Sequence, residues 1–230
     1  MLSNAEYIAP GLIVYRNVFS EDLNLINRLE EILSNESNEN NWNTSKTPPG
    51  RAPIGKKYRE CSDFKIKKNT WDDSGKSESI LKLEKIWEDC YTSVLGPVED
   101  YAQHFRLPPL GYWAPFNFVK YDIGEYIEVH SDHAYSHICV LSAVGYINDD
   151  YEGGELFFDK LNLKIKPKAG DLYLYPSTYL YSHASLPITH GTKYAIVTFL
   201  DYLEAPHTPE YKEIEHKEID KKQIKAVYYK

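Results

Sequence analysis

The sequence predicts a mainly β (α+β) domain, a jelly roll of about eight strands that helices from the N-terminal half support. Its second half is rich in Tyr, Phe, Val and Ile, in short apolar runs separated by Gly and Pro. Residues 161–166, LNLKIK, alternate apolar and polar side chains, as a strand with one wet face does. No strand-helix-strand repeat appears, which argues against a doubly wound parallel sheet.

The N-terminal region predicts one strand and two helices. Residues 7–19 read as the strand, with a break at Gly11, and Ser20 is placed to cap the first helix. Ser77 is placed to begin the second helix, which Gly96-Pro97 is expected to interrupt. The apolar stripes of both helices should pack against one side of the sheet.

A polar segment separates these helices. Residues 35–75 are too polar to supply a regular buried element and predict a long insertion. Within it, residues 46–68 hold eight Lys and Arg against two acidic residues. This basic stretch is a candidate for substrate recognition, and an ordinary solvated loop is the alternative.

We expect one domain over residues 1–230, because all-β domains often reach this length. It divides into an N-terminal region of strand, helices and polar loop (1–108), a jelly-roll core (109–202) and a charged tail (203–230) without recognisable chemistry. The strands expected in the core are residues 113–121, 126–132, 137–148, 155–159, 161–166, 171–175, 179–183 and 193–200.

Composition restricts the partners and the compartment. A net charge of −8 argues against broad affinity for nucleic acid. Three cysteines without a Cys-x-x-Cys motif indicate neither a disulfide framework nor a cysteine zinc site, and favour a reducing compartment. No signal-peptide pattern and no run of 18 apolar residues occurs, so we expect a cytoplasmic protein without a membrane partner.

Residues 121–132, YDIGEYIEVHSD, carry the candidate metal site. Two residues apart on a strand, His130 and Asp132 point to one face, and His183 is available as a third ligand. Two imidazoles and one carboxylate suit the facial site of non-haem Fe(II) oxygenases, although zinc could use the same ligands in a hydrolase. Lys193 begins a strand; pointing inward, it would need a carboxylate partner, which a dicarboxylate ligand could supply.

The order of motifs between residues 110 and 200 resembles that of the Fe(II)- and 2-oxoglutarate-dependent dioxygenases of the prolyl 4-hydroxylase type. Tyr121, Gly124 and Tyr126 lead to His130-x-Asp132, followed by residues 146–148 (YIN) and 151–156 (YEGGEL). The pattern continues with residues 168–171 (KAGD) and then with His183, Pro187, Gly191 and Lys193.

This resemblance implies a double-stranded β-helix and a set of roles. His130, Asp132 and His183 would bind Fe(II), and Lys193 would pair with the distal carboxylate of 2-oxoglutarate. Tyr146 matches a family position whose hydroxyl donates a hydrogen bond to the same carboxylate, and Tyr121 matches a tyrosine that lines the cosubstrate pocket. For both tyrosines, ordinary packing in the barrel is the alternative. O2 and ascorbate complete the expected cofactors.

The activity implied is hydroxylation of a C–H bond of peptidyl proline with release of succinate and CO2, so the expected partner is a peptide or protein. One alternative keeps the chemistry on a nucleic-acid or small-molecule substrate, with residues 46–68 as the contact. A zinc-dependent hydrolase and a non-catalytic jelly-roll binding protein would also fit these residues.

Overall fold

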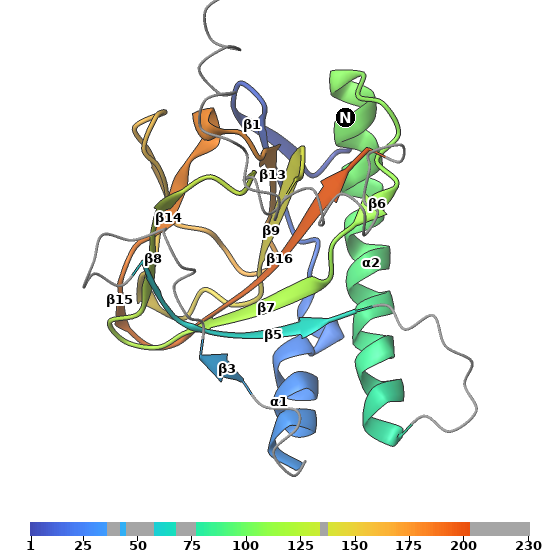
Figure 1. The fold of residues 1–230 in the computed structure, drawn as a ribbon, viewed down its shortest axis with the longest axis vertical. Helices are drawn as coiled ribbons and strands as arrows, with labels where there is room; N and C mark the ends of the chain where they lie inside the picture. Colours follow the sequence, from blue (N-terminus) through green and yellow to red (C-terminus); the bar gives the residue numbers. More distant parts are fainter. Residues whose placement is uncertain (36–41, 45–57, 68–76, 134–137, 203–230) are drawn as a thin grey trace, which may run out of the picture.

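The computed structural model describes residues 1–35, 42–44, 58–67, 77–133 and 138–202. Two antiparallel sheets face each other, which confirms the mainly β jelly-roll fold (Figure 1). The larger sheet runs, in spatial order, β1 (Ala5–Ala9), β2 (Leu12–Tyr15), β13 (Leu172–Pro176), β9 (Leu141–Tyr146), β16 (Lys193–Asp201), β7 (Phe116–Tyr121), β5 (Ser62–Ile66) and β3 (Asn43–Thr44), with β6 (Tyr112–Trp113) on β16.

The smaller sheet closes the other side of the barrel. Its order is β12 (Leu163–Ile165), β11 (Leu156–Phe158), β14 (His183–Ser185), β8 (Tyr126–His130) and β4 (Arg59–Glu60). A separate pair joins β10 (Glu152–Gly153) to β15 (Ile188–His190). The side chains that point inward from both sheets therefore meet in one interior, where the site lies.

Two helices cover the outer face of the larger sheet, α1 (Leu25–Asn35) and α2 (Glu78–Phe105) (Figure 1). Strand alternation divides the apolar residues between two cores. On β7, Phe116 and Phe118 pack toward the helices, whereas Val119 and Tyr121 belong to the interior between the sheets. The helix layer thus supports the sheet from behind and leaves its inner face to the site.

The structure corrects the predicted cap of the first helix and the predicted interruption of the second. Ser20 makes no side-chain cap; a short 3-10 turn, Glu21–Leu23, ends at left-handed Asn24, and α1 begins at Leu25. Helix α2 does begin after Ser77, which accepts from the Ile80 amide, but it continues through Pro97. Buried Val94 and Val98 lie on either side of that proline, so packing offsets the roughly 3 kcal/mol that an interior proline costs.

The polar segment contains a buried strand, contrary to the sequence prediction. Phe64 and Ile66 of β5 are buried in the core under the helices, and β5 pairs with β7 along five residues. A strand needs only alternate apolar residues when one face is wet, and the surrounding charges hid this pattern. The predicted strand at 179–183 is also wrong, because Tyr179–Tyr181 form a 3-10 turn and the strand begins at His183.

Some predicted features lie outside the described residues, namely the charged tail from residue 203 and most of the basic stretch. Within the described part, no helix is long and apolar enough to span a membrane.

Candidate active site

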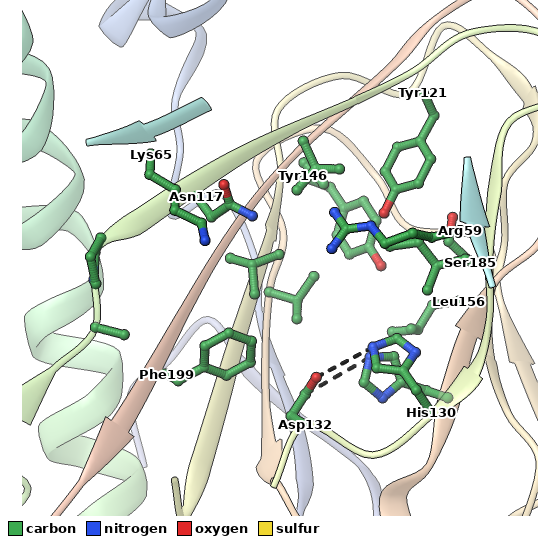
Figure 2. A pocket seen from close by; sticks show the side chains of 18 of the residues that line it. Arg59, Lys65, Asn117, Tyr121, His130, Asp132, Tyr146, Leu156, Ser185 and Phe199 are labelled. Carbon is green, nitrogen blue, oxygen red and sulfur yellow. Dashed lines mark ion pairs between the residues drawn. The ribbon is translucent and has the colours of Figure 1, made fainter. Parts of the chain in front are cut away.

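The smaller sheet brings the three predicted ligands together. His130 ends β8 and pairs across the sheet with His183, which begins β14, while Asp132 follows β8 by two residues. One ligand atom from each residue lies within 4.8 Å of the others. Asp132 Oδ1 is 3.4 Å from His130 Nε2, and Asp132 Oδ2 is 3.9 Å from His183 Nε2 (Figure 2). The arrangement suits a single metal ion.

Backbone carbonyls set the tautomer of both imidazoles. The Nδ1 of His130 donates to Glu128 O at 2.9 Å, and that of His183 donates to Tyr181 O at 3.1 Å. A carbonyl oxygen only accepts, so each proton sits on Nδ1 and each Nε2 presents a lone pair. In the structure, Tyr175 donates to His183 Nε2 at 3.1 Å. Two imidazole Nε2 atoms and a carboxylate therefore fit Fe(II).

The charge states agree with this arrangement. Burial lowers the pKa of His183 to about 4, so the ring is neutral near pH 7. Burial alone would raise the pKa of Asp132, but His183 and His130, which are protonated at the low pH where this carboxyl titrates, and the Ser142 hydroxyl lower it below its usual range. Ser142 Oγ lies 2.6 Å from Asp132 Oδ2 and 2.8 Å from Ser177 Oγ. The carboxylate is thus ionised and held in one orientation.

Lys193 is a buried cation in the same interior. Its side chain is 1% exposed and donates to Gly154 O and to Ser185 Oγ. Burial, together with nearby Lys166, lowers the pKa of Lys193 to about 7. Within the described part of the chain, no carboxylate oxygen lies within 4.0 Å of its ammonium group. Such a group is poised to accept an anion.

Two predicted tyrosines lie beside Lys193. Tyr121 pairs with Lys193 across β7 and β16, and its ring centroid is 4.3 Å from the ammonium nitrogen. Tyr146 on β9 lies opposite Ala195, with its ring 5.7 Å from the same nitrogen. Both are buried, and burial raises both phenol pKa values well above the usual range, so the hydroxyls remain protonated donors.

A cavity of about 500 Å³ connects these groups (Figure 2). Its walls hold the three candidate ligands, Lys193 and both tyrosines. Apolar side chains, among them Val144, Leu156 and Val197, form much of the rest. The cavity thus joins a candidate metal centre to a buried cation in largely apolar surroundings, which suits a small anion that also chelates the metal.

Sequence reasoning missed several residues of this site. Ser185 lies two residues after His183 in β14 and lines the cavity, a position that strand alternation could have indicated. Ser142 is a polar residue inside an otherwise apolar strand, which was a weaker signal. Asn117 also lines the cavity, yet only the pairing of β7 with β5 and β16 places it there. Arg59, Lys65 and Lys67, which line the same cavity, belong to the basic stretch predicted as a candidate for substrate recognition.

The histidines that lie near the triad in sequence have different roles. His133 Nδ1 lies 2.7 Å from Cys139 O, and this contact links the chain that follows Asp132 to the start of the next segment. His190 on β15 is exposed, and His137 lies outside the described residues. Neither His133 nor His190 lines the cavity.

Comparisons with known proteins agree with the site. Residues 116–201, which include the triad and Lys193, match the model of the 2OG-Fe(II) oxygenase superfamily. Mouse procollagen-lysine,2-oxoglutarate 5-dioxygenase 1 is 28% identical over 127 residues, which are 53% of this chain and 17% of that enzyme. A putative prolyl 4-hydroxylase of Acanthamoeba polyphaga mimivirus is 28% identical over 142 residues, covering 53% of this chain and 58% of that protein.

These curated relatives are longer, so the chain matches only part of each. Among solved structures, a prolyl hydroxylase from Trichoplax adhaerens, in complex with a hypoxia inducible factor peptide fragment, has the same fold, with a TM-score of 0.63 and 13% identity. The alignment covers 90% of this chain and 88% of that one. Residues 116–201, which carry the triad, are thus similar to the 2OG-Fe(II) oxygenase superfamily, whose members use Fe(II), 2-oxoglutarate and O2, and the Trichoplax structure shares the fold of the chain.

Proposed function

We propose that the chain is an Fe(II)- and 2-oxoglutarate-dependent dioxygenase that hydroxylates peptidyl proline and releases succinate and CO2. The observation that carries the proposal is Lys193, a buried ammonium group without a carboxylate partner among the described residues, in the same cavity as the triad. A dicarboxylate that also reaches the metal would satisfy both features at once. 2-Oxoglutarate has this chemistry.

Each side chain has a defined task in this proposal. His130, Asp132 and His183 would hold Fe(II) on one face, and Lys193 with Tyr146 would hold the distal carboxylate of 2-oxoglutarate. When bound, the iron would activate O2, which is the oxidant; 2-oxoglutarate would supply two of the four electrons and leave as succinate and CO2, and the C–H bond would supply the other two. The apolar walls keep water and oxidisable groups away from the reacting carbon. Tyr121 would close the cosubstrate end beside Lys193.

The prolyl substrate rests on the relatives. The mimivirus relative is named a putative prolyl 4-hydroxylase, and the Trichoplax enzyme is described with a bound peptide. The procollagen-lysine relatives make peptidyl lysine the second candidate residue, because they are similar over the same part of the chain. Ascorbate as a reductant, a cytoplasmic location and the single-domain division stay predictions.

A direct assay tests the proposal. Pure protein is incubated with Fe(II), 2-oxoglutarate, O2 and peptides that contain one proline, one lysine or neither. We expect succinate release and a gain of one oxygen, mapped by mass spectrometry to proline. An oxygen found on lysine would refute the prolyl assignment, and absence of 2-oxoglutarate turnover with every substrate class would refute the dioxygenase assignment. Protein loaded with Zn(II) instead of Fe(II) should give no turnover. A zinc hydrolase, by contrast, would be active only with Zn(II).

Ser142 provides a second test of the metal centre. Substitution of Ser142 by alanine removes the donor to Asp132 Oδ2, and we expect Fe(II) affinity to fall about tenfold or more, in the range for hydrogen-bond partners of metal ligands. Metal titration at fixed 2-oxoglutarate measures this change. Thr198→Val is the matched control, because Thr198 also loses a buried hydrogen bond, to Ala114 O, but does not contact the triad. Equal losses in both variants would contradict a specific role for Ser142.

A further inference from the structure

The cavity has a second cationic end, away from Lys193. Lys65 and Asn117 are cross-strand partners on β5 and β7 and line the cavity with Lys67. Figure 2 shows Lys65 and Asn117 together on one side, while Arg59, Tyr121 and Ser185 lie on the other. Asp132 and His130 lie below both groups in the view. A substrate could therefore reach the metal while touching Lys65 and Lys67.

The neighbouring strand residues hold these lysines in place. Phe64 and Ile66 are buried on the opposite face of β5, in the core under the helices. Because strand side chains alternate, Lys65 is turned toward the cavity, and Lys67 follows at the end of the strand. Both are exposed residues of the predicted basic stretch.

Neither lysine is neutralised within the described residues. No carboxylate there lies within 4.0 Å of Lys65 or Lys67. Arg59 differs: burial opposes its charged form, but Cys61, whose Sγ lies 3.3 Å from Arg59 Nη2, and Asp63 raise its pKa. Asp132 is the one carboxylate among the described residues that line the cavity. The two lysines therefore bring positive charge that the cavity wall does not balance.

A fully loaded site would not use this charge. Fe(II), Asp132, Lys193 and the two carboxylates of 2-oxoglutarate together carry no net charge, so the lysines remain for the substrate. Beside them, the side-chain oxygen of Asn117 is buried and accepts no hydrogen bond from the described residues. This end thus offers two ammonium groups and one unfilled acceptor, which match a carboxylate side chain and a backbone N–H of a peptide.

We propose that the substrate is an acidic peptide, in which Asp or Glu side chains close to the hydroxylated residue pair with Lys65 and Lys67. This inference rests on the proposed function and specifies its substrate. Two exposed lysines that line one end of the cavity suit a side-chain carboxylate, whereas a nucleic-acid backbone would need a wider basic surface. Pairing here selects among peptides and adds no chemistry at the metal.

Peptide binding tests the proposal apart from turnover. Three fluorescein-labelled peptides carry one proline flanked on both sides by Asp, by Ala or by Lys, and their affinity for protein loaded with Fe(II) and 2-oxoglutarate is measured by anisotropy without O2. We expect the Asp peptide to bind about tenfold more tightly than the Ala peptide, and the Lys peptide most weakly. The difference should shrink at high salt, because the lysines are exposed.

Charge reversal provides the decisive comparison. In the double variant Lys65→Glu/Lys67→Glu, the order of peptide affinities should invert, so that the Lys peptide binds most tightly. A misfolded protein could not gain affinity for the Lys peptide. Lys164→Glu is the control, because Lys164 is an exposed residue of β12 that does not line the cavity, and its preference should match wild type. Each single variant, Lys65→Glu and Lys67→Glu, should lower the affinity for the Asp peptide.

The outcomes separate this inference from the proposed function. Equal affinity for the three peptides, or the same preference after charge reversal, would overturn the inference even if proline is hydroxylated and succinate released. A single-stranded oligonucleotide that binds more tightly than the Asp peptide, and releases on charge reversal, would overturn it in favour of nucleic acid. If the wild-type protein shows no 2-oxoglutarate turnover at all, that result would instead count against the proposed function.

Discussion

Substitution of His183 by alanine is expected to abolish Fe(II) binding and, with it, all 2-oxoglutarate turnover. His183 supplies one of three clustered ligand atoms, and the neutral ring is held by Tyr181 O and Tyr175 so that Nε2 faces Asp132. Losing a ligand should cost more than the roughly 10–100-fold in metal affinity that losing a hydrogen-bond partner of a ligand costs. Metal titration and succinate release measure the two effects.

The control for this variant is His104→Ala. His104 is an exposed residue near the end of α2 whose ring packs edge-on against Phe105, and it does not line the cavity. It should retain metal binding and turnover. Circular dichroism and thermal melting establish that the His183 variant is folded, because removing a buried ring leaves a void. A folded His183→Ala protein with normal iron content would refute the assigned role.

Substitution of Lys193 by alanine is expected to raise the KM for 2-oxoglutarate by about 10–100-fold, because a hydrogen bond to a charged group contributes about 1.5–3 kcal/mol. Fe(II) affinity should change little, since Lys193 contacts Gly154 O and Ser185 Oγ rather than the triad. Initial rates over a range of 2-oxoglutarate concentrations measure the shift. Lys164→Ala on β12 should keep the wild-type KM.

The same variant should also lose a pH dependence. The ammonium form of Lys193 binds the carboxylate, and its pKa without ligand is lowered to about 7. The affinity for 2-oxoglutarate should therefore be greatest below pH 7 and fall as pH rises, by up to about tenfold per unit, until the raised pKa of the complex is reached. A flat wild-type profile between pH 7 and 9, or an unchanged KM in the variant, would contradict the role of Lys193.

The proximity of two candidate metal ligands could be predicted because their signal is local. His130 and Asp132 are two residues apart at the end of a strand, and this spacing alone places both side chains on one face. His183 required the motif order of a family, since residues 53 positions apart meet only through the pairing of β8 and β14. The family's motif order indicates that His183 lies near His130 and Asp132. Composition and periodicity do not contain this information.

The predictions failed where packing outweighed local preference. Local rules predict that Pro97 ends a helix, but the apolar face of α2 continues on both sides of it and is buried against the sheet. The same rules predict no buried element in the polar segment, yet Phe64 and Ile66 insert into the core. In both cases a tertiary contact that local rules do not contain decided the outcome.

The sequence by itself determined the mainly β fold and the pairing of His130 with Asp132 on one face, because alternation is a local pattern; with the family's motif order it also indicated His183 and Lys193. The tertiary structure alone decided that Lys193 has no carboxylate partner among the described residues, that Ser142 orients Asp132, and that Lys65 lies beside Asn117 at the cavity wall. Burial and strand register depend on residues far apart in the chain. The preference for an acidic substrate could therefore be inferred only from the pairing of β5 with β7, which brings the lysines to the cavity.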